Sequence, residues 1–117
     1  MPTTVLIVDD HPSFRATARA ILQADGFDVI GEAETGVAGL RCAKELEPDV
    51  VLLDVQLPDS DGFEVASRLT GNGRGPLVVL TSSRDAADFG PLVAQSGARG
   101  FVAKADLSGA ALKAVLG

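Results

Sequence analysis

Residues 50–62 read VVLLDVQLPDSDG, and this stretch decides the expected fold. Val50 to Leu53 form a continuous apolar run, which is typical of a strand buried on both faces of a parallel sheet. The run ends directly on the carboxylate of Asp54, and a turn that contains Pro58 follows. A charge at the edge of a core is unfavourable unless a partner compensates it. We therefore expect another part of the chain to bring a positive charge to Asp54.

The segments on either side alternate between strand and helix patterns. Apolar runs rich in β-branched residues predict further strands at Thr4–Val8, 27–33, 77–81 and 100–104. Helices are predicted within residues 11–26, 35–49, 62–69, 82–98 and 106–117. Strands that alternate with helices form a parallel sheet covered on both faces. The sequence therefore predicts one doubly wound α/β domain over residues 1–117.

Two details of the helices can be read from residue spacing. Apolar side chains recur at helical spacing in the first two helices, at Phe14, Ala18, Ile21 and Leu22 and at Val37, Leu40 and Ala43. We expect each stripe to be part of the core. Gly90 and Pro91 interrupt the fourth helix, and proline is tolerated only in a first turn. That helix should therefore start near Pro91 and be short or displaced.

Composition excludes several classes of protein. The chain has 117 residues and a formal charge of −6, without a run of Lys or Arg, so it is not expected to bind nucleic acid by itself. Its single cysteine, Cys42, excludes an intramolecular disulfide and a cysteine-based metal site. The N-terminus lacks a signal-peptide pattern, and no apolar run approaches the length of a membrane span. We expect a soluble, cytoplasmic protein.

Polar residues stand where the predicted strands end. Asp9 and Asp10 follow the first strand, Asp54 and Thr81 end the third and fourth, and Lys104 ends the fifth. In open α/β sheets these ends meet at one edge, where ligands bind. Three carboxylates without Cys or His ligands suit Mg²⁺ or Mn²⁺, and a cation with a lysine can stabilise a transferring phosphoryl group. A carboxylate can itself accept that group, and Asp54 is the best candidate.

Competing interpretations of these residues predict other sequence features. The loop DDHPSF after the first strand lacks both the dinucleotide and the P-loop glycine patterns. Gln56 stands where an aspartate phosphatase with a D-x-D motif would carry its second acid. His11 is expected to be a solvated residue at a helix start, outside the site. Taken singly, Asp9 could cap that helix and Asp54 a turn, but their clustering favours chemistry.

Four segments together closely resemble the receiver domain of bacterial two-component response regulators. They are LIVDD at 6–10, LLDVQLPDSDG at 52–62, VVLTS at 78–82 and GFVAK at 100–104, and the likeness covers essentially the whole chain. The resemblance implies a flavodoxin-like sheet with strand order 2-1-3-4-5. It also implies that Asp54 is the phosphoacceptor and that a sensor histidine kinase donates the phosphoryl group.

The resemblance assigns roles around Asp54. Asp10 and Asp54 would bind Mg²⁺ directly, together with the backbone carbonyl of Gln56, and Asp9 would act mainly through water. The chain would control an output, most simply transcription, because VDDHPSFR at 8–15 is similar to the start of regulators with a LuxR/NarL-type helix-turn-helix. We favour a receiver separated from such an output domain over a stand-alone receiver. A phosphorylation-dependent homodimer stays open.

The resemblance also assigns a switch. Thr81 would be the switch hydroxyl, and Phe101, three residues before Lys104, the switch aromatic. Their movement would change the surface of the fourth helix, fifth strand and fifth helix. Gln56 and Ser83 would tune the hydrolysis of the phosphorylated form. Core packing is the alternative for Phe101, and strand-end punctuation is the alternative for Thr81.

One departure from the family pattern follows Lys104. Many relatives carry proline there, in a cis peptide, whereas this chain has Ala105. A non-proline cis bond costs about 2.5–4 kcal/mol, so a trans bond or a locally strained one is expected.

The sequence leaves three functions open. The leading one is a phosphorylation-gated switch that is no enzyme toward a separate substrate. The others are a phosphohydrolase with Asp54 as nucleophile and a degenerate receiver that acts as a constitutive interaction module.

Overall fold

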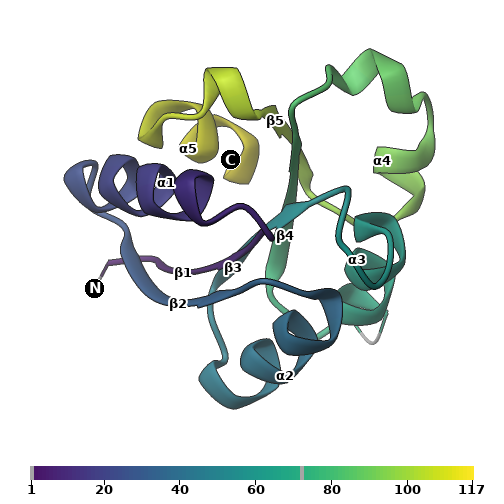
Figure 1. Cartoon of the computed structure of the whole chain (residues 1–117), viewed down its shortest axis with the longest axis horizontal. Helices are drawn as coiled ribbons and strands as arrows, with labels where there is room; N and C mark the ends of the chain where they lie inside the picture. Colours follow the sequence, from purple (N-terminus) through teal and green to yellow (C-terminus); the bar gives the residue numbers. More distant parts are fainter. Residues whose placement is uncertain (1, 72) are drawn as a thin grey trace.

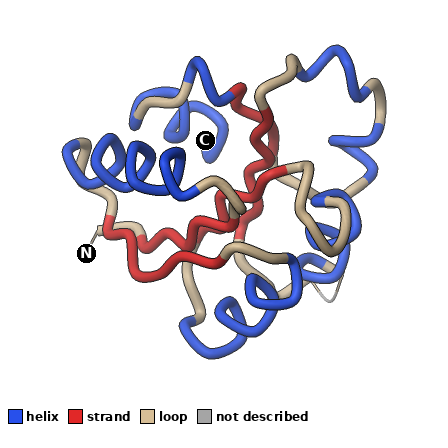
Figure 2. The backbone as a smooth tube through the Cα atoms, in the orientation of Figure 1, coloured by secondary structure: helices blue, strands red, loops and turns tan. Residues whose placement is uncertain are grey.

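One parallel sheet runs through the centre of the protein, and helices cover both of its faces (Figures 1 and 2). The computed structural model describes residues 2–71 and 73–117. The strands are β1 (Thr4–Val8), β2 (Asp28–Ala33), β3 (Val50–Asp54), β4 (Leu77–Ser82) and β5 (Gly100–Ala103). The helices are α1 (Pro12–Ala24), α2 (Gly36–Leu46), α3 (Gly62–Thr70), α4 (Leu92–Gln95) and α5 (Gly109–Leu116). Two 3₁₀ turns, η1 (Ala86–Phe89) and η2 (Lys104–Asp106), flank the last strand and its preceding helix.

The sheet order is β2-β1-β3-β4-β5, which confirms the predicted flavodoxin-like topology. Alternate residues of the strands enter separate cores on the two faces. On β1, Val5 and Ile7 pack with α1 and α5, while Leu6 and Val8 pack with α2 and α3. Figure 1 shows the same two layers, with α1 beside α5 and α2 beside α3. Both faces are covered, and this is why the strands read as continuous apolar runs.

The predicted stripe on α2 is wrong at Val37, which is 59% exposed. The face that turns inward is instead Gly36, Gly39 and Ala43. A Cβ atom on Gly39 would lie 2.9 Å from Cγ1 of Val8. The helix therefore approaches the sheet through its glycines, and this rotation leaves Val37 in solvent.

Several element ends differ from the sequence-based bounds by one to three residues. The second strand begins at Asp28 and the fourth extends to Ser82, while the fifth stops at Ala103. The last helix starts at Gly109 because the Ser108 hydroxyl accepts a hydrogen bond from Ala111 N at 3.0 Å, which caps the helix.

The segment after β4 behaves as Gly90 and Pro91 predict. The chain forms the short turn η1, turns at Gly90 with φ of 56°, and begins the four-residue α4 directly after Pro91. The peptide between Lys104 and Ala105 is trans, as is every peptide bond that the structure describes. Among the described residues, no helix has the length and apolar character needed to cross a membrane.

Candidate phosphoacceptor and metal site

The carboxyl ends of the central strands bring the predicted polar residues together. Asp9 follows β1, Asp54 ends β3, and Thr81 on β4 stands in register beside Asp54. Lys104 enters from the turn after β5. The start of α3 closes the loop tightly, because a Cβ atom on Gly62 would collide with the backbone carbonyl of Asp54. Residues distant in sequence therefore share one edge of the sheet.

Asp54 is buried, with 3% of its surface exposed. Its Oδ1 accepts a hydrogen bond from Gln56 N at 3.1 Å, and its Oδ2 lies 3.3 Å from Lys104 Nζ. Burial raises the pKa of Asp54, and the Asp9 charge raises it further, while the Gln56 amide and Lys104 oppose the shift. The positive charge that the sequence requires at Asp54 is therefore Lys104.

Lys104 contacts two carboxylates and an aromatic ring. Its Nζ lies 2.6 Å from Oδ2 of Asp9, closer than it lies to Asp54, and 4.4 Å from the ring centroid of Phe14 on α1. A cation over an aromatic face is attracted by the ring quadrupole. The apolar stripe predicted Phe14 only as a core residue, since no local pattern joins residue 14 to residue 104.

The carboxylate set fits a hard divalent cation. Oxygen atoms of Asp9, Asp10 and Asp54 and a nitrogen of His11 lie within 4.8 Å of one another. Within the described part of the chain, Oδ2 of Asp9 and Oδ1 of Asp10 are buried without a hydrogen-bond partner, although Asp9 Oδ2 has its ion pair with Lys104. Three carboxylates repel one another unless cations compensate them, and Lys104 supplies one charge only. The remaining negative charge favours a cation with oxygen ligands.

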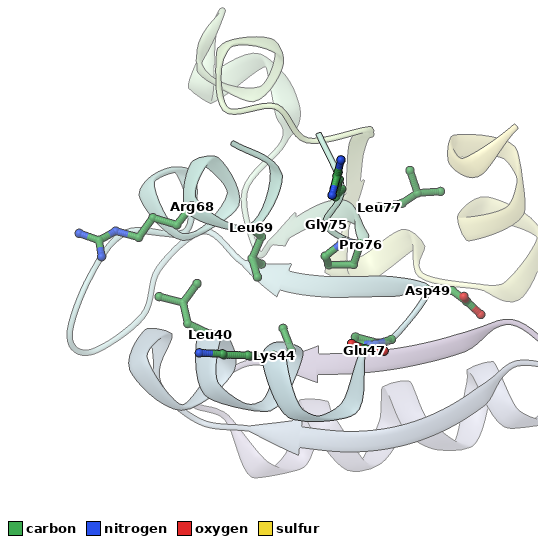
Figure 3. A pocket seen from close by; sticks show the side chains of 12 residues that line it. Leu40, Lys44, Glu47, Asp49, Arg68, Leu69, Gly75, Pro76 and Leu77 are labelled. Atoms are coloured by element: carbon green, nitrogen blue, oxygen red, sulfur yellow. The ribbon is translucent and has the colours of Figure 1, made fainter. Parts of the chain in front are cut away.

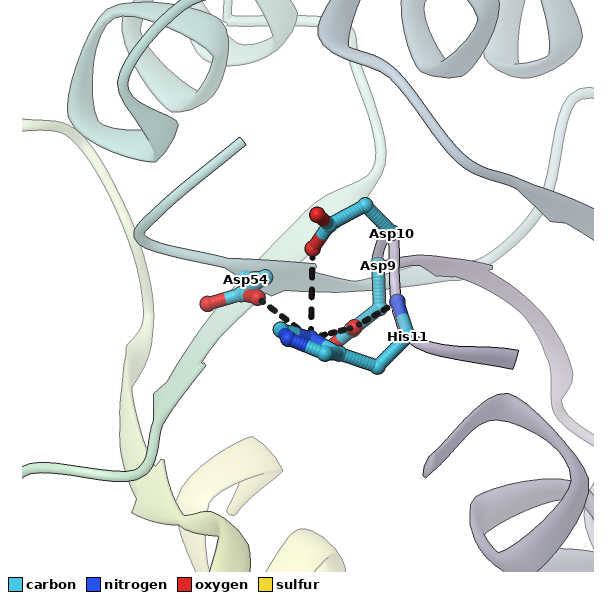
Figure 4. Close-up of side chains that lie close together, drawn as sticks. All are labelled: Asp9, Asp10, His11 and Asp54. Atoms are coloured by element: carbon cyan, nitrogen blue, oxygen red, sulfur yellow. Dashed lines mark hydrogen bonds and ion pairs between the residues drawn. The ribbon is translucent and has the colours of Figure 1, made fainter. Parts of the chain in front are cut away.

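His11, which the sequence interpretation placed outside the site, lies beside its three carboxylates (Figure 4). Its side chain is 62% exposed, as expected for a helix start, yet its Nδ1 lies 3.0 Å from Asp9 Oδ1 and 3.2 Å from Asp10 Oδ1. The cause is local. His11 N donates to Asp9 Oδ1 at 2.8 Å, and this bond folds the loop so that the ring turns back over the carboxylates.

Arg15 also contacts this loop, and no sequence pattern indicated that contact. Its Nη1 donates to the backbone carbonyl of Asp9 at 2.6 Å, and its Nε lies 3.1 Å from Glu32 on β2. Arg19 binds the other oxygen of Glu32 at 2.7 Å, and Arg19 is the first cause of the lowered pKa of that glutamate. The hydrogen bond from Arg15 thus ties α1 to Asp9, while the two ion pairs hold α1 against β2.

Of the predicted switch residues, Thr81 lies on β4 beside Asp54, and Phe101 lies on the neighbouring strand β5. The buried hydroxyl of Thr81 donates to Val102 O on β5 at 2.7 Å. Phe101 is half-buried, and its ring centroid lies 5.7 Å from that of Phe89 in η1. Ser83 is exposed beyond β4. The hydroxyl is thus bonded to the strand that carries the aromatic residue.

Gln56 has an exposed side chain and contacts Asp54 through its amide, so its carbonyl as a metal ligand stays a prediction. A groove of about 940 Å³ lies at the opposite, amino end of the strands (Figure 3). It lies between α2, α3 and the start of β4, and its lining includes Leu40, Lys44 and Arg68 but none of the predicted site residues.

Comparison with known proteins agrees with this architecture. The response regulator receiver domain family matches residues 5–115. The transcription regulator of virulence factors BvgA from Bordetella pertussis is 40% identical over 104 residues, which cover 89% of this chain and 50% of BvgA. A protein-glutamate methylesterase/protein-glutamine glutaminase of Hahella chejuensis is 43% identical over 84 residues, 72% of this chain and 24% of that enzyme.

A solved structure shows the same arrangement. The signal receiver domain of the response regulator NarL from Mycobacterium tuberculosis has a TM-score of 0.87 and 33% identity, over 99% of this chain and 98% of that domain. The chain spans about half the length of BvgA. Since the family match extends over almost every element that forms the sheet and its acidic edge, the chain belongs to the response regulator receiver domains of two-component systems.

Proposed function

We propose that this receiver is a phosphorylation-gated switch that accepts a phosphoryl group on Asp54 from a sensor histidine kinase in the cytoplasm. The observation that carries the proposal is the buried Asp54 carboxylate, compensated by Lys104 at 3.3 Å and crowded by further acids. Asp10, Asp54 and the carbonyl of Gln56 would hold Mg²⁺ or Mn²⁺, and Asp9 would act through water. The orphaned oxygen of Asp10 supports a cation at this place.

Phosphoryl transfer to the ionised carboxylate of Asp54 would need little proton transfer. A carboxylate oxygen of Asp54 forms a bond to phosphorus while the bond from phosphorus to the donor nitrogen breaks. Burial raises the pKa of Asp54, and a more basic carboxylate is a stronger nucleophile once ionised. Lys104 already lies beside Asp54 and compensates the added negative charge. A bound Mg²⁺ would neutralise the carboxylates and the phosphoryl oxygens during transfer.

Signal output would start at Thr81. The Thr81 hydroxyl donates a 2.7 Å hydrogen bond to Val102 O, and this hydrogen bond must break before the hydroxyl can reach a phosphoryl oxygen. Val102, the neighbour of Phe101 on β5, would then lose its contact with Thr81. The Phe101 ring packs on the Phe89 ring, and the ring centroid of Phe89 lies 5.5 Å from that of Phe63 on α3. A movement of Phe101 would therefore be transmitted to η1 and to the short α4. The surface of α4, β5 and α5 is the proposed output face.

The output we propose is transcription, through a LuxR/NarL-type helix-turn-helix domain. Support comes from BvgA, a transcription regulator of which this chain matches about half. No separate substrate is proposed for the receiver itself, which would only transfer and hydrolyse its own phosphoryl group. Gln56 and Ser83, both exposed, would tune that hydrolysis.

The test is intact mass after incubation with Mg²⁺ and acetyl phosphate. We expect one added phosphoryl group in the wild type, none without Mg²⁺ and none in Asp54→Asn. Asp59→Asn is a matched control, because Asp59 is an exposed acid in the same loop. Phosphate release measured in parallel separates a rapidly hydrolysed adduct from an unreactive receiver. Turnover of many equivalents of a phosphoester would instead contradict the switch and indicate a phosphohydrolase.

A further inference from the structure

The proposed metal site contains one residue that the oxygen-ligand description does not use. His11 Nδ1 lies 3.0 Å from Asp9 Oδ1, 3.2 Å from Asp10 Oδ1 and 4.0 Å from Asp54 Oδ2 (Figure 4). His11 precedes α1, but its side chain makes no capping hydrogen bond with the described residues of that helix. The imidazole therefore faces the carboxylates and has no separate role in the helix.

The three distances match those between ligands of one ion. Around an octahedral ion with bonds of about 2.0–2.1 Å, neighbouring ligands lie roughly 2.9 Å apart and opposite ligands roughly 4.1 Å apart. His11 Nδ1 has two carboxylate oxygens near the first separation and one near the second. The distances from His11 Nδ1 to the three carboxylates therefore fit ligands of one ion.

One unsatisfied oxygen points to a ligand at this place. Among the described residues, Asp10 Oδ1 is buried and accepts no hydrogen bond, although His11 Nδ1 lies 3.2 Å away, and the Asp9 side chain is fully buried. Three carboxylates face one ammonium, Lys104. An imidazole beside them changes the chemistry, because Mg²⁺ prefers oxygen, whereas Zn²⁺, Co²⁺ and Ni²⁺ bind imidazole nitrogen well.

We propose that His11 Nδ1 is a metal ligand that lets this site bind borderline divalent cations, of which Zn²⁺ is the probe, in addition to Mg²⁺. The inference rests on the proposed function, since both use the carboxylates of Asp9, Asp10 and Asp54. A Zn²⁺ ion held there would occupy the place of Mg²⁺, and with His11 among its ligands it would have one position fewer for a phosphoryl oxygen. Phosphorylation would then be inhibited by such ions in competition with Mg²⁺.

The competing explanation is that the imidazole only donates a hydrogen bond to Asp9. In that case, removing it disturbs the carboxylates for every cation alike. If His11 is a ligand, its removal weakens Zn²⁺ binding and leaves Mg²⁺ binding nearly unchanged. The ratio of the two affinities therefore separates the explanations.

The experiment titrates the untagged chain with Zn²⁺ and with Mg²⁺ by calorimetry, in the wild type and in His11→Ala. We expect the Zn²⁺ affinity to fall at least about tenfold and the Mg²⁺ affinity to change less than about twofold. Cys42→Ser is the control, because Cys42 is the only thiol in the chain and should not alter either affinity. Equal losses for both ions, or no loss for Zn²⁺, would overturn the proposal.

A spectroscopic measurement identifies the nitrogen. His11 is the only histidine, so the imidazole ¹⁵N resonances are unambiguous. Zn²⁺ should shift Nδ1 strongly and Nε2 little, and an unshifted Nδ1 would refute the coordination. Acetyl phosphate labelling is run on both proteins with Mg²⁺ alone and with Mg²⁺ plus Zn²⁺. If the wild type with Mg²⁺ alone shows neither labelling nor phosphate release, the proposed switch is wrong. A His11→Ala protein that is labelled yet as sensitive to Zn²⁺ as the wild type overturns only this inference.

Discussion

Replacing Lys104 with methionine tests how the acidic cluster is stabilised. Lys104 Nζ lies 2.6 Å from Asp9 Oδ2 and 3.3 Å from Asp54 Oδ2, and both carboxylates are almost fully buried. Methionine keeps most of the apolar stem against Phe14 but removes the charge. Breaking a buried pair from one side leaves its partner charge uncompensated, which is the most destabilising change such a pair can undergo.

The magnitude can be worked from these distances. At an effective dielectric constant of about 20, the attractions are roughly 6 kcal/mol to Asp9 and roughly 5 kcal/mol to Asp54. Desolvation of the ammonium, several kcal/mol in real proteins, offsets much of this sum. We expect Lys104→Met to lower the free energy of unfolding by about 3–5 kcal/mol at pH 7 without Mg²⁺. Domains of this size have a total stability of about 5–15 kcal/mol, so the loss is large.

The loss of stability in Lys104→Met should depend on pH and on the Mg²⁺ concentration. The pKa of Asp54 is higher in the folded protein than its unfolded value of 3.8. Above the folded pKa, the ionised carboxylate therefore lowers the free energy of unfolding. This loss of stability disappears as the pH falls toward 3.8 and Asp54 is protonated in the folded state. Without Lys104 this penalty is larger. The deficit of the variant should therefore shrink on acidification, and Mg²⁺ should stabilise the variant more than the wild type.

Urea unfolding followed by circular dichroism measures these free energies. Lys44→Met is the matched control, because Lys44 is exposed on α2, and we expect a change within about 0.5 kcal/mol. A loss below about 1 kcal/mol for Lys104→Met, or a loss equal at all pH values and Mg²⁺ concentrations, would refute the reasoning.

Three further changes probe the core, the switch and the loop. Leu52→Ala, at a fully buried position of β3, should cost about 2–5 kcal/mol in the same urea assay, and a loss under 1 kcal/mol would contradict the packing described. Thr81→Val removes the hydroxyl that donates to Val102 O and should cost about 0.5–1.5 kcal/mol, while an increase in stability would argue against that bond. Asp59 accepts from Gly36 N, which is the first cause of its lowered pKa, so Asp59→Asn should be less stable at neutral pH. That difference should disappear as the pH falls through the folded pKa of Asp59, and a difference that persists in acid would exclude its carboxylate charge as the cause.

The sequence by itself determined the strands, the topology class and the acidic edge. Runs such as Val50 to Leu53 are apolar over their whole length because both faces of the sheet are covered, so their signal is local and strong. Asp54 and Thr81 end such runs, and parallel strands bring those ends to one edge. Gly90 and Pro91 likewise restrict the backbone locally, which is why the short α4 could be predicted.

Only the tertiary structure decided how side chains from different elements meet. Helical spacing placed Val37 inward, but the close approach of Gly39 to β1 rotates it into solvent. No pattern near His11 shows that its ring turns over Asp9, and none near Lys104 shows that it lies over Phe14. The physical reason is the distance along the chain over which each effect acts. Periodicity and capping act within a few residues, whereas these contacts depend on how packed helices set the distance and rotation of loops that are far apart in the chain.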